Sequence, residues 1–427
     1  GYSGHERGIE VPIAAVAMGA AVIEKHITLD RGMEGNDHKV SLLPEEFAQM
    51  IQGIRRVEES MGQGGERSIS QGEMMNREVL AKSLVAACDV PAGTEITEAM
   101  VRIQSPGQGL QPNRLPDLLG RRLPVAKAQG EVFFPSDLET PAATPRTYRF
   151  RQPFGLPVRY HDIKVFSKVS NLDLVEIHLS YKDLEVDLDQ VLPERQEIGL
   201  VVHAPELFAG DHTLDLCTAD EGYRDHSVRE LQRVIDISRD LRGRFRCPAP
   251  VLLVTNVGGF SEHRHLDRDE RKPLQQRLIE SLGRLNCGGD VEIIPQTMPP
   301  FPWHFGGQRF HNLFVDPGFI HSFCEQQGMR VCLDVSHSKL ACNHLHLPFR
   351  DFLNRILPFT AHLHLADARD VDGEGLQIQD GEIDWVQLFE QINQHCPQAS
   401  FIPEIWQGHK NGGEGAWLAL ERLEAAA

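Results

Sequence analysis

The sequence lacks the features that mark several classes of protein. Its eight cysteines form no Cys-x-x-Cys pair and are scattered through apolar segments, a pattern typical of reduced thiols. No apolar run reaches the length that spans a bilayer, and no segment has the make-up of a signal peptide. The 43 Lys and Arg residues are outnumbered by 61 Asp and Glu residues, which argues against broad binding of nucleic acid or anionic membranes. We therefore expect a soluble cytoplasmic protein that binds neither.

The first 30 residues have the pattern of an α/β unit. Gly1–His5 is rich in turn residues, and Gly8–Ala21 is small, apolar and of helix length. Ala21–Leu29 is apolar and β-branched around a polar centre, as a barrel strand with a functional end would be.

Two histidines follow the strands of this unit. His5 and His26 would lie at the C-terminal ends of neighbouring parallel strands, where α/β barrels carry their chemistry. Two neutral imidazoles that face one cavity suit a divalent cation such as Mn²⁺, Fe²⁺ or Zn²⁺. The spacing alone also fits two unrelated histidines, so both interpretations stay open on this pattern.

The next segments divide into a barrel tail, a small domain and a linker. Residues 1–75 predict two strands and two helices, the second helix at Pro44–Met61 and then a linker at Gly62–Gly72. Two strands cannot close a barrel, so we expect further strands before Gly1. Residues 77–139 predict a small β-rich domain with strands at Lys82–Ala87, Met100–Ile103, Leu123–Ala126 and Val132–Phe134. Residues 140–154, which include Pro141–Pro145, predict a linker.

Residues 155–427 alternate between strand-like and helix-like segments and predict a complete (β/α)8 TIM barrel. The expected strands are Val158–Ile163, Leu174–His178, Ile198–His203, Val251–Asn256, Val291–Gln296, Arg330–Asp334, Ala361–Leu365 and Phe401–Glu404. Helices are expected at Ser227–Leu241, Asp269–Leu285, Phe349–Leu357 and Trp385–His395. The predicted fold class is thus α/β, with a truncated TIM-barrel tail, a small β-rich domain and a complete TIM barrel.

Polar side chains stand where these strands end. They are Glu176, His178, His203, Asn256, Gln296, Asp334, His337, His364 and Glu404. A strand buried on both sides has no reason to finish in such residues unless the strand mouth is a site, although a buried polar network without a metal is an alternative. The loop Thr297–Asn312 concentrates aromatic residues and glycines, and a wall against a sugar face and a packed lid are equally compatible with it.

The string GYSGHERGIEVPIAAVAMGAAVIEKHITLD resembles the last two strands of the sialic acid synthase family. The resemblance implies condensation of phosphoenolpyruvate with an N-acyl-hexosamine-type sugar, with His5 and His26 as metal ligands. It also implies that Ser3 helps to bind the phosphate and that Asp37 contacts the sugar and takes part in catalysis. Residues 77–139 resemble the antifreeze-like (SAF) domain of the same family, whose members form homodimers. Relatives carry a sugar-binding Arg where this chain has Gln104-Ser105-Pro106.

The segments VCLDVSH, HLHLAD and IPE resemble the last three strands of the sugar phosphate isomerase/epimerase superfamily, which includes xylose isomerase. The resemblance implies that Asp334, His364 and Glu404 ligate Mn²⁺ or a similar ion and that His337 is the histidine that binds substrate or supports the ligands, with a part in catalysis. His203, at the end of its strand, is a further candidate for contact with the substrate. Gln296 stands where relatives have a ligating Glu; its carbonyl can still ligate, but it neither carries a charge nor accepts a proton. Endonuclease-type DNA cleavage is disfavoured by the acidic charge of the chain and by Asn256 and Gln296.

Three hypotheses for function follow. The first is part of a phosphoenolpyruvate-dependent synthase of nonulosonic (sialic-type) acids, fused to an isomerase/epimerase-like barrel, in surface polysaccharide biosynthesis. On this hypothesis we do not expect the given chain to run the synthase reaction by itself. The second is metal-dependent isomerisation or epimerisation of a sugar or sugar phosphate, as the only complete activity. The third is a non-catalytic barrel that binds sugar.

Overall fold

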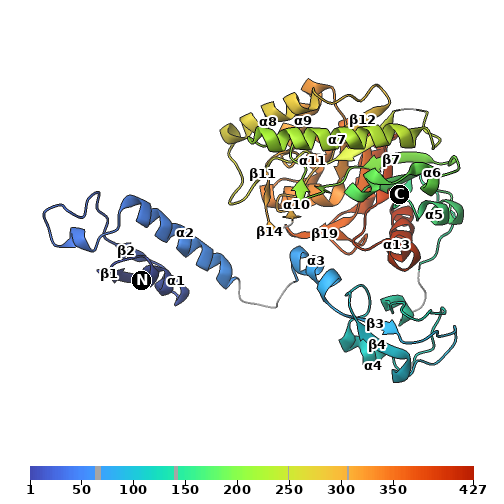
Figure 1. The fold of residues 1–427 in the computed structure, drawn as a ribbon, viewed down its shortest axis with the longest axis horizontal. Coiled ribbons are helices and arrows are strands. Elements are labelled where there is room, and N and C mark those ends of the chain that lie inside the picture. Colours follow the sequence, from blue (N-terminus) through green and yellow to red (C-terminus); the bar gives the residue numbers. More distant parts are fainter. Residues whose placement is uncertain (63–68, 139–142, 249, 305–306) are drawn as a thin grey trace. The chain divides into compact units, whose positions relative to one another are not determined.

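The computed structural model describes residues 1–62, 69–138, 143–248, 250–304 and 307–427 (Figure 1). The chain forms two compact units, Gly1–Ser68 and Ile69–Ala427. No helix among the described residues is long and apolar enough to cross a membrane. The eight cysteines are thiols rather than members of disulfides.

The first unit is a parallel strand pair with two helices. Its elements are β1 (Tyr2–Gly4), α1 (Glu10–Ala17), β2 (Ile23–Lys25), the 3₁₀ turn η1 (Asp37–Lys39) and α2 (Pro44–Met61). Tyr2 pairs with Ile23 and Gly4 with Lys25, so both strands end at the same edge. Strand β2 is shorter than the predicted Ala21–Leu29, because beyond Lys25 the chain forms only a single bridge, between Ile27 and Leu42. Helix α2 begins and ends as predicted.

The second unit begins with a helix and the small domain. Helix α3 (Gln71–Leu80) starts inside the predicted linker, where the Ser70 hydroxyl accepts a hydrogen bond from the Glu73 N–H. Residues 63–68 of that linker lie outside the described residues. Strands β3 (Ser83–Ala86) and β4 (Val101–Gln104) pair antiparallel, and α4 (Leu115–Leu118) follows.

Two strands predicted for the small domain were wrong. Residues 123–126 and 132–134 form no strand, and the chain there makes only single bridges such as Val85 with Val132 and Val90 with Lys127. The domain is instead held together by a compact apolar core that includes Leu84, Leu118 and Phe133. In this domain, a short apolar segment between turns therefore indicated a strand in some places and a buried core position in others.

Among the described residues, eight parallel strands close into a barrel (Figure 1). They are β5 (Gly155–Val158), β6 (Leu174–His178), β7 (Gly199–His203), β10 (Val251–Thr255), β12 (Val291–Pro295), β16 (Val331–Asp334), β17 (Thr360–Leu365) and β20 (Ser400–Pro403). Parallel bridges from Gln296 to Cys332 and from Phe154 to Phe401 join the five-stranded and three-stranded sheets into a ring. The predicted complete barrel is confirmed, although its first strand lies earlier than the predicted Val158–Ile163, because Pro157 stands inside the strand and obscures it in the sequence.

Helices surround the barrel, and several begin at an aspartate. The helices are α5 (Ile163–Val169), α6 (Leu188–Val191), α7 (Glu221–Arg242), α8 (Arg268–Leu282), α9 (Pro317–Gln327), α10 (Val335–Leu345), α11 (Phe349–Ile356), α12 (Trp385–His395) and α13 (Lys410–Ala426). Asp220, Asp267, Asp316, Asp334 and Asp384 each accept a hydrogen bond from a backbone N–H in the first turn of a helix. Short antiparallel strand pairs lie in the loops. They are β8 (Leu207–Phe208) with β9 (His212–Thr213), β11 (Phe260–Ser261) with β15 (Phe310–His311), β13 (Trp303–His304) with β14 (Gly307–Gln308), and β18 (Asp367–Arg369) with β19 (Gly373–Leu376).

The predicted linker 140–154 is shorter than expected. Tyr148 is 2 % exposed, its ring stacks on Trp417 at 6.4 Å between centroids, and its hydroxyl donates to the Trp417 carbonyl. Burial of a large aromatic ring is favourable by about 2 kcal/mol, so this segment is part of the barrel. Residues 139–142 lie outside the described residues.

Candidate functional site

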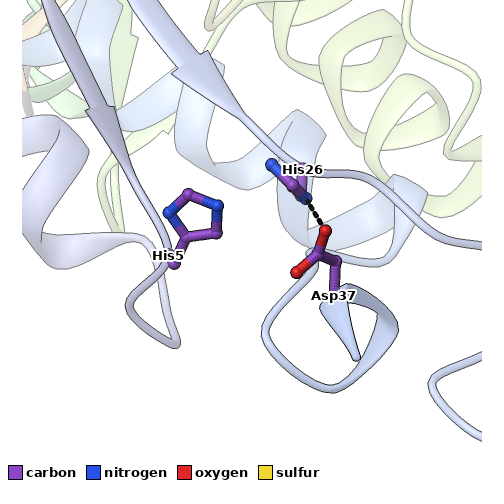
Figure 2. A group of neighbouring side chains, drawn as sticks. All are labelled: His5, His26 and Asp37. Atoms are coloured by element: carbon purple, nitrogen blue, oxygen red, sulfur yellow. Dashed lines mark ion pairs between the residues drawn. The ribbon is translucent and has the colours of Figure 1, made fainter. Parts of the chain in front are cut away.

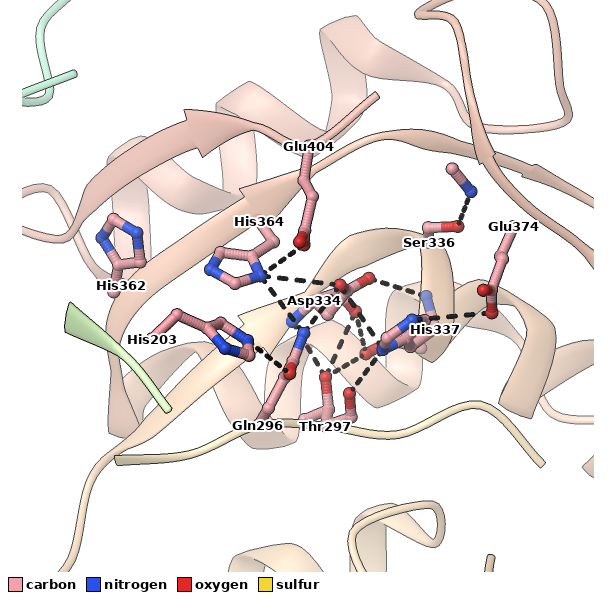
Figure 3. Close-up of polar contacts among 12 residues, drawn as sticks. His203, Gln296, Thr297, Asp334, Ser336, His337, His362, His364, Glu374 and Glu404 are labelled. Atoms are coloured by element: carbon pink, nitrogen blue, oxygen red, sulfur yellow. Dashed lines mark hydrogen bonds and ion pairs between the residues drawn. The ribbon is translucent and has the colours of Figure 1, made fainter. Parts of the chain in front are cut away.

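Polar side chains from four strands meet at the C-terminal mouth of the larger barrel (Figure 3). The Nδ1 atom of His364 on β17 lies 2.6 Å from Glu404 Oε2 and 3.8 Å from Asp334 Oδ2. Ligand atoms of these three residues all lie within 4.8 Å of one another. The structure thus brings together three of the four residues that the sequence analysis expected to ligate a metal, as an imidazole nitrogen with two carboxylates.

The fourth residue, Gln296, lies beside the same atoms. Its Nε2 donates to Asp334 Oδ2 at 3.1 Å and lies 3.2 Å from His364 Nδ1. Its Oε1 lies 3.3 Å from Nε2 of His203, whose Nδ1 lies 2.8 Å from the Ala204 carbonyl. The four predicted ligands and the predicted substrate contact His203 therefore form one hydrogen-bonded group.

A buried carboxylate lies behind His364. Glu176 on β6 accepts hydrogen bonds from His364 Nε2 at 3.0 Å and from His362 Nε2 at 2.7 Å, and all three side chains are completely buried. Burial by itself raises the pKa of Glu176, but His364, His178 and His362 outweigh it and hold the pKa well below its usual range. Since Nε2 of His364 donates to Glu176, its Nδ1 is the atom directed at Asp334 and Glu404.

His364 itself is held in a charged environment. Burial lowers the pKa of its imidazole, but Cys332, Glu176 and Glu404 together raise it well above the usual value. The raised pKa implies a proton on Nδ1 of His364. This proton lies between Asp334 and Glu404, where a metal ion would bind. A divalent ion would replace that proton, because an imidazole ligates in its neutral form.

His337 lies at the edge of the same cluster, in the first turn of α10. Its backbone N–H donates to Asp334 Oδ1 at 2.8 Å, and its Nε2 lies 3.7 Å from Glu374 Oε2 (Figure 3). Burial lowers the pKa of His337, but Asp334, Glu374 and Glu404 together raise it above the usual value. Burial raises the pKa of Glu374 to about 7, which is near the value that suits proton transfer at neutral pH.

These side chains open into a cavity of about 800 Å³. Its lining includes the predicted residues His178, His203, Gln296, Asp334, His337 and Glu404, and also Trp406. Arg159, Glu206 and Glu374 line it as well and were not predicted. Glu374 lies on β19, after β17, so no end of a barrel strand marks it in the sequence as a site residue.

The structure also bears on two other expectations, for Asn256 and for the loop Thr297–Asn312. Asn256 does not join the cluster: its Oδ1 accepts a hydrogen bond from the Gly258 N–H and so holds a turn. In the loop Thr297–Asn312, Phe301 and Phe310 pack edge to face on each other and on His265. Among the described side chains of that loop, none lines the cavity, so the packing of a lid is favoured over a sugar-binding wall.

The first unit carries a second, more open cluster (Figure 2). The rings of His5 and His26 lie 4.7 Å apart between centroids, and His26 Nδ1 lies 3.7 Å from Asp37 Oδ2. The three residues form a group whose ligand atoms lie within 4.8 Å of one another. Asp37, expected as a sugar contact, thus joins the two histidines, and Ser3 lies nearby on β1 with its hydroxyl donating to Glu24 Oε1 at 2.7 Å.

Comparison with protein families covers most of the chain. Residues 167–425 match the family described as xylose isomerase-like TIM barrel. The chain belongs to this family. Residues 1–66 match the NeuB family and residues 81–139 match the SAF domain, in agreement with the resemblances found in the sequence.

The relatives and solved structures each match only part of the chain. The chain is 42% identical over 121 residues to N,N'-diacetyllegionaminic acid synthase of Campylobacter jejuni, a match that covers 28% of this chain and 36% of the relative. It is 42% identical over 134 residues to N-acetylneuraminate-9-phosphate synthase of Homo sapiens, covering 31% and 37%. The chain thus spans little more than a third of these relatives. A crystal structure of a D-tagatose 3-epimerase-like protein covers 64% of this chain and 98% of its own, with 18% identity and a TM-score of 0.47.

Proposed function

We propose that the larger barrel is a metal-dependent sugar isomerase or epimerase, and that the first unit and the SAF domain are part of a nonulosonic acid synthase. The proposal for the larger barrel rests on the convergence of Asp334, His364 Nδ1 and Glu404 at the mouth of a closed barrel. The cavity beside them has the volume of a sugar-sized site. Surface polysaccharide biosynthesis in the cytoplasm is the setting we propose for the whole protein.

The donor set fits a divalent ion such as Mn²⁺. One imidazole nitrogen and two carboxylates are common ligands of divalent transition metals. Gln296 completes the set if its amide turns by 180°, since Oε1 then faces the cluster and Nε2 donates to His203. That orientation also suits a neutral His203, because its Nδ1–H donates to the Ala204 carbonyl and its Nε2 is then an acceptor. Burial lowers the pKa of His203 and so favours this neutral form.

The residues of the site suit proton transfer next to a carbonyl group. When bound, a divalent ion polarises a carbonyl and makes the neighbouring C–H more acidic. His337 Nε2 and Glu374 Oε2 face each other at 3.7 Å, so this pair can hold a proton and pass it to or from a substrate in the cavity. Glu404 approaches from β20 and supplies a carboxylate from a different strand.

Proton exchange tests this proposal directly. The metal-stripped chain is reloaded with Mn²⁺ for binding measurements or Mg²⁺ for NMR, and incubated in D₂O with free hexoses, ketoses and N-acylhexosamines. We expect deuterium to enter the carbon next to the carbonyl of at least one sugar, and Asp334→Asn to abolish this exchange. Failure of every sugar to exchange, with metal bound, would contradict an isomerase or epimerase.

The first unit supports the synthase half of the proposal. In a synthase, a metal at His5 and His26 would polarise the sugar aldehyde, and Ser3 would contact the phosphate of phosphoenolpyruvate. Several large apolar side chains of this unit face solvent, among them Val22 at 68 % and Leu29 at 83 % exposed. Such side chains suit the tail of a barrel whose other strands cover them. We propose a homodimer for the whole protein, and the test of this half is condensation of phosphoenolpyruvate with an N-acylhexosamine by the complete protein.

A non-catalytic sugar-binding barrel is the second candidate. The observation that favours it is Gln296, whose amide supplies no charge and takes up no proton at a position beside both Asp334 and His364. The exchange experiment separates the two candidates. A chain that binds a sugar without exchanging any of its protons is a binding module.

A further inference from the structure

The side chains around the larger barrel's cavity are strongly acidic. Six carboxylates line it: Glu78, Asp162, Glu206, Asp334, Glu374 and Glu404. Among the described lining residues, Arg159 is the only lysine or arginine. A divalent ion held by Asp334 and Glu404 would neutralise those two groups, and Glu78 is paired with Lys410. The carboxylates of Asp162, Glu206 and Glu374 then remain, beside five histidines of the lining (His161, His178, His203, His337 and His409).

The one guanidinium of the cavity already has a partner. Arg159 forms an ion pair with Asp183, through Nη2 and Oδ2. Asp183 is fixed in turn, because the Ser180 N–H donates to the same carboxylate at 2.7 Å and the Ser180 hydroxyl donates to it at 2.8 Å. Asp183 therefore holds Arg159 in a neutral pair.

Two backbone groups near the cavity that resemble anion sites are also occupied. The N-terminus of α10 is capped by the Asp334 side chain, which accepts from the His337 N–H. The turn Asn411–Gly413 has left-handed backbone angles, but the Gly413 N–H donates to the His409 carbonyl at 3.2 Å. A proton on His337 would be balanced by Glu374, 3.7 Å away.

We infer that the sugar taken by this site carries no phosphate or carboxylate, so that the substrate class is a free or N-acylated neutral sugar. This inference rests on the proposed sugar site and narrows it. A sugar phosphate would bring about two negative charges into a cavity where carboxylates outnumber the single, paired guanidinium. Neutral hydroxyl and amide groups meet no such repulsion and can hydrogen-bond to the same carboxylates.

The experiment compares two probes that differ by one phosphoryl group, and the salt dependence isolates the effect of its charge. Binding of N-acetylmannosamine and of N-acetylmannosamine 6-phosphate to the Mn²⁺-loaded full chain is measured by calorimetry at low and high salt. We expect the neutral sugar to bind at least about tenfold more tightly, a difference of about 1.4 kcal/mol. Salt should strengthen binding of the phosphate by screening the repulsion, and leave the neutral sugar unchanged.

Asp183→Asn sharpens the comparison. The asparagine keeps an oxygen for the Ser180 N–H but frees Arg159, so affinity for the 6-phosphate should rise several-fold while the neutral sugar is unaffected. Asp189→Asn is the matched control, because Asp189 pairs with Arg244 and neither residue lines the cavity among the described residues.

Three results would overturn the inference. The first is equal or tighter binding of the phosphate by the unmodified chain, and the second is phosphate binding that weakens as salt rises; both leave the proposed function standing. The third is binding of neither probe and of none of the free hexoses, ketoses and N-acylhexosamines used in the exchange experiment, which overturns the proposed function together with the inference.

Discussion

The two clusters of this chain contain similar ligands in different surroundings. In the larger barrel, the side chains of Asp334 and His364 are 5 % and 0 % exposed, and His364 is fixed by a hydrogen bond to Glu176. In the first unit, His26 and Asp37 are 35 % and 65 % exposed, and they face each other at 3.7 Å. Buried ligands whose second nitrogen is already bonded are pre-oriented for a metal, whereas open ligands must be ordered when it binds. We therefore expect the larger barrel to bind a divalent ion more tightly than the first unit.

The largest effect is expected from removing a ligand of the buried cluster. Asp334→Asn keeps the cap of α10 but removes a negative charge from the site, and it should weaken Mn²⁺ binding by more than about 100-fold. Calorimetric titration of the metal-stripped chain measures this. His5→Ala is the comparison variant and should leave the tight site intact, so loss of that site in His5→Ala would contradict the ranking of the clusters.

Glu176→Gln tests the carboxylate behind the ligand. The amide cannot accept from both imidazoles with a full charge, so Mn²⁺ affinity should fall by about 10- to 100-fold. The loss of a buried charge from its partners should also cost about 3–5 kcal/mol in the free energy of unfolding, read from denaturant titration. Glu292→Gln, at the surface ion pair with Arg330, is the control and should change stability by less than about 1 kcal/mol. Equal effects of the two variants would show that Glu176 has no special role.

Gln296→Glu should raise the affinity of the larger barrel for Mn²⁺, whereas the two variants above should lower it. A third carboxylate beside Asp334 and His364 should tighten Mn²⁺ binding by about tenfold, or about 1.4 kcal/mol. Without metal, the same carboxylate adds repulsion, and the melting temperature of the metal-free chain should fall by a few degrees. Gln276→Glu on the exposed part of α8 should do neither. Weaker metal binding by Gln296→Glu would show that position 296 does not face the ion.

A smaller effect is expected from pH in the first unit. The hydrogen bond from the buried ammonium of Lys25 lowers the pKa of Glu6 from 4.5 to about 2. Because the folded pKa lies below the unfolded one, this pair stabilises the unit above pH 4.5 and loses that contribution as pH falls from 4.5 to 2. NMR titration of the Glu6 carboxyl in the full chain should give the low pKa. Lys25→Met should return the pKa toward 4.5 and Lys39→Met should not; an ordinary pKa in the unmodified chain would contradict the pairing.

The larger barrel and the meeting of its polar side chains at one mouth could be predicted from the sequence because the barrel places equivalent positions together. Asp334, His364 and Glu404 stand at or next to the ends of three consecutive strands, and a parallel barrel brings such positions to one mouth. Glu374 could not be found in this way, since its place depends on the path of a loop. Tyr148 was missed because a single aromatic residue between turn residues carries no periodicity, and its burial depends on α13, which lies more than 250 residues later in the chain.

The limits of the helices were likewise predictable from the sequence in some places and not in others. Trp385–His395 was predicted without error because a strong apolar face is bounded by Asp384 at its start. His344 and His346 lie at the end of α10, where His346 has left-handed backbone angles. Basic side chains suit the C-terminus of a helix, and the Asp334 cap fixes where α10 starts.

The central claim is tested most directly by anomalous diffraction from crystals of the chain loaded with Mn²⁺. We predict a manganese peak bounded by Asp334, His364 Nδ1 and Glu404, with the Gln296 Oε1 atom turned toward it. A crystal in which manganese occupies other positions, while His364 Nδ1 keeps its hydrogen bond to Glu404, would contradict the account.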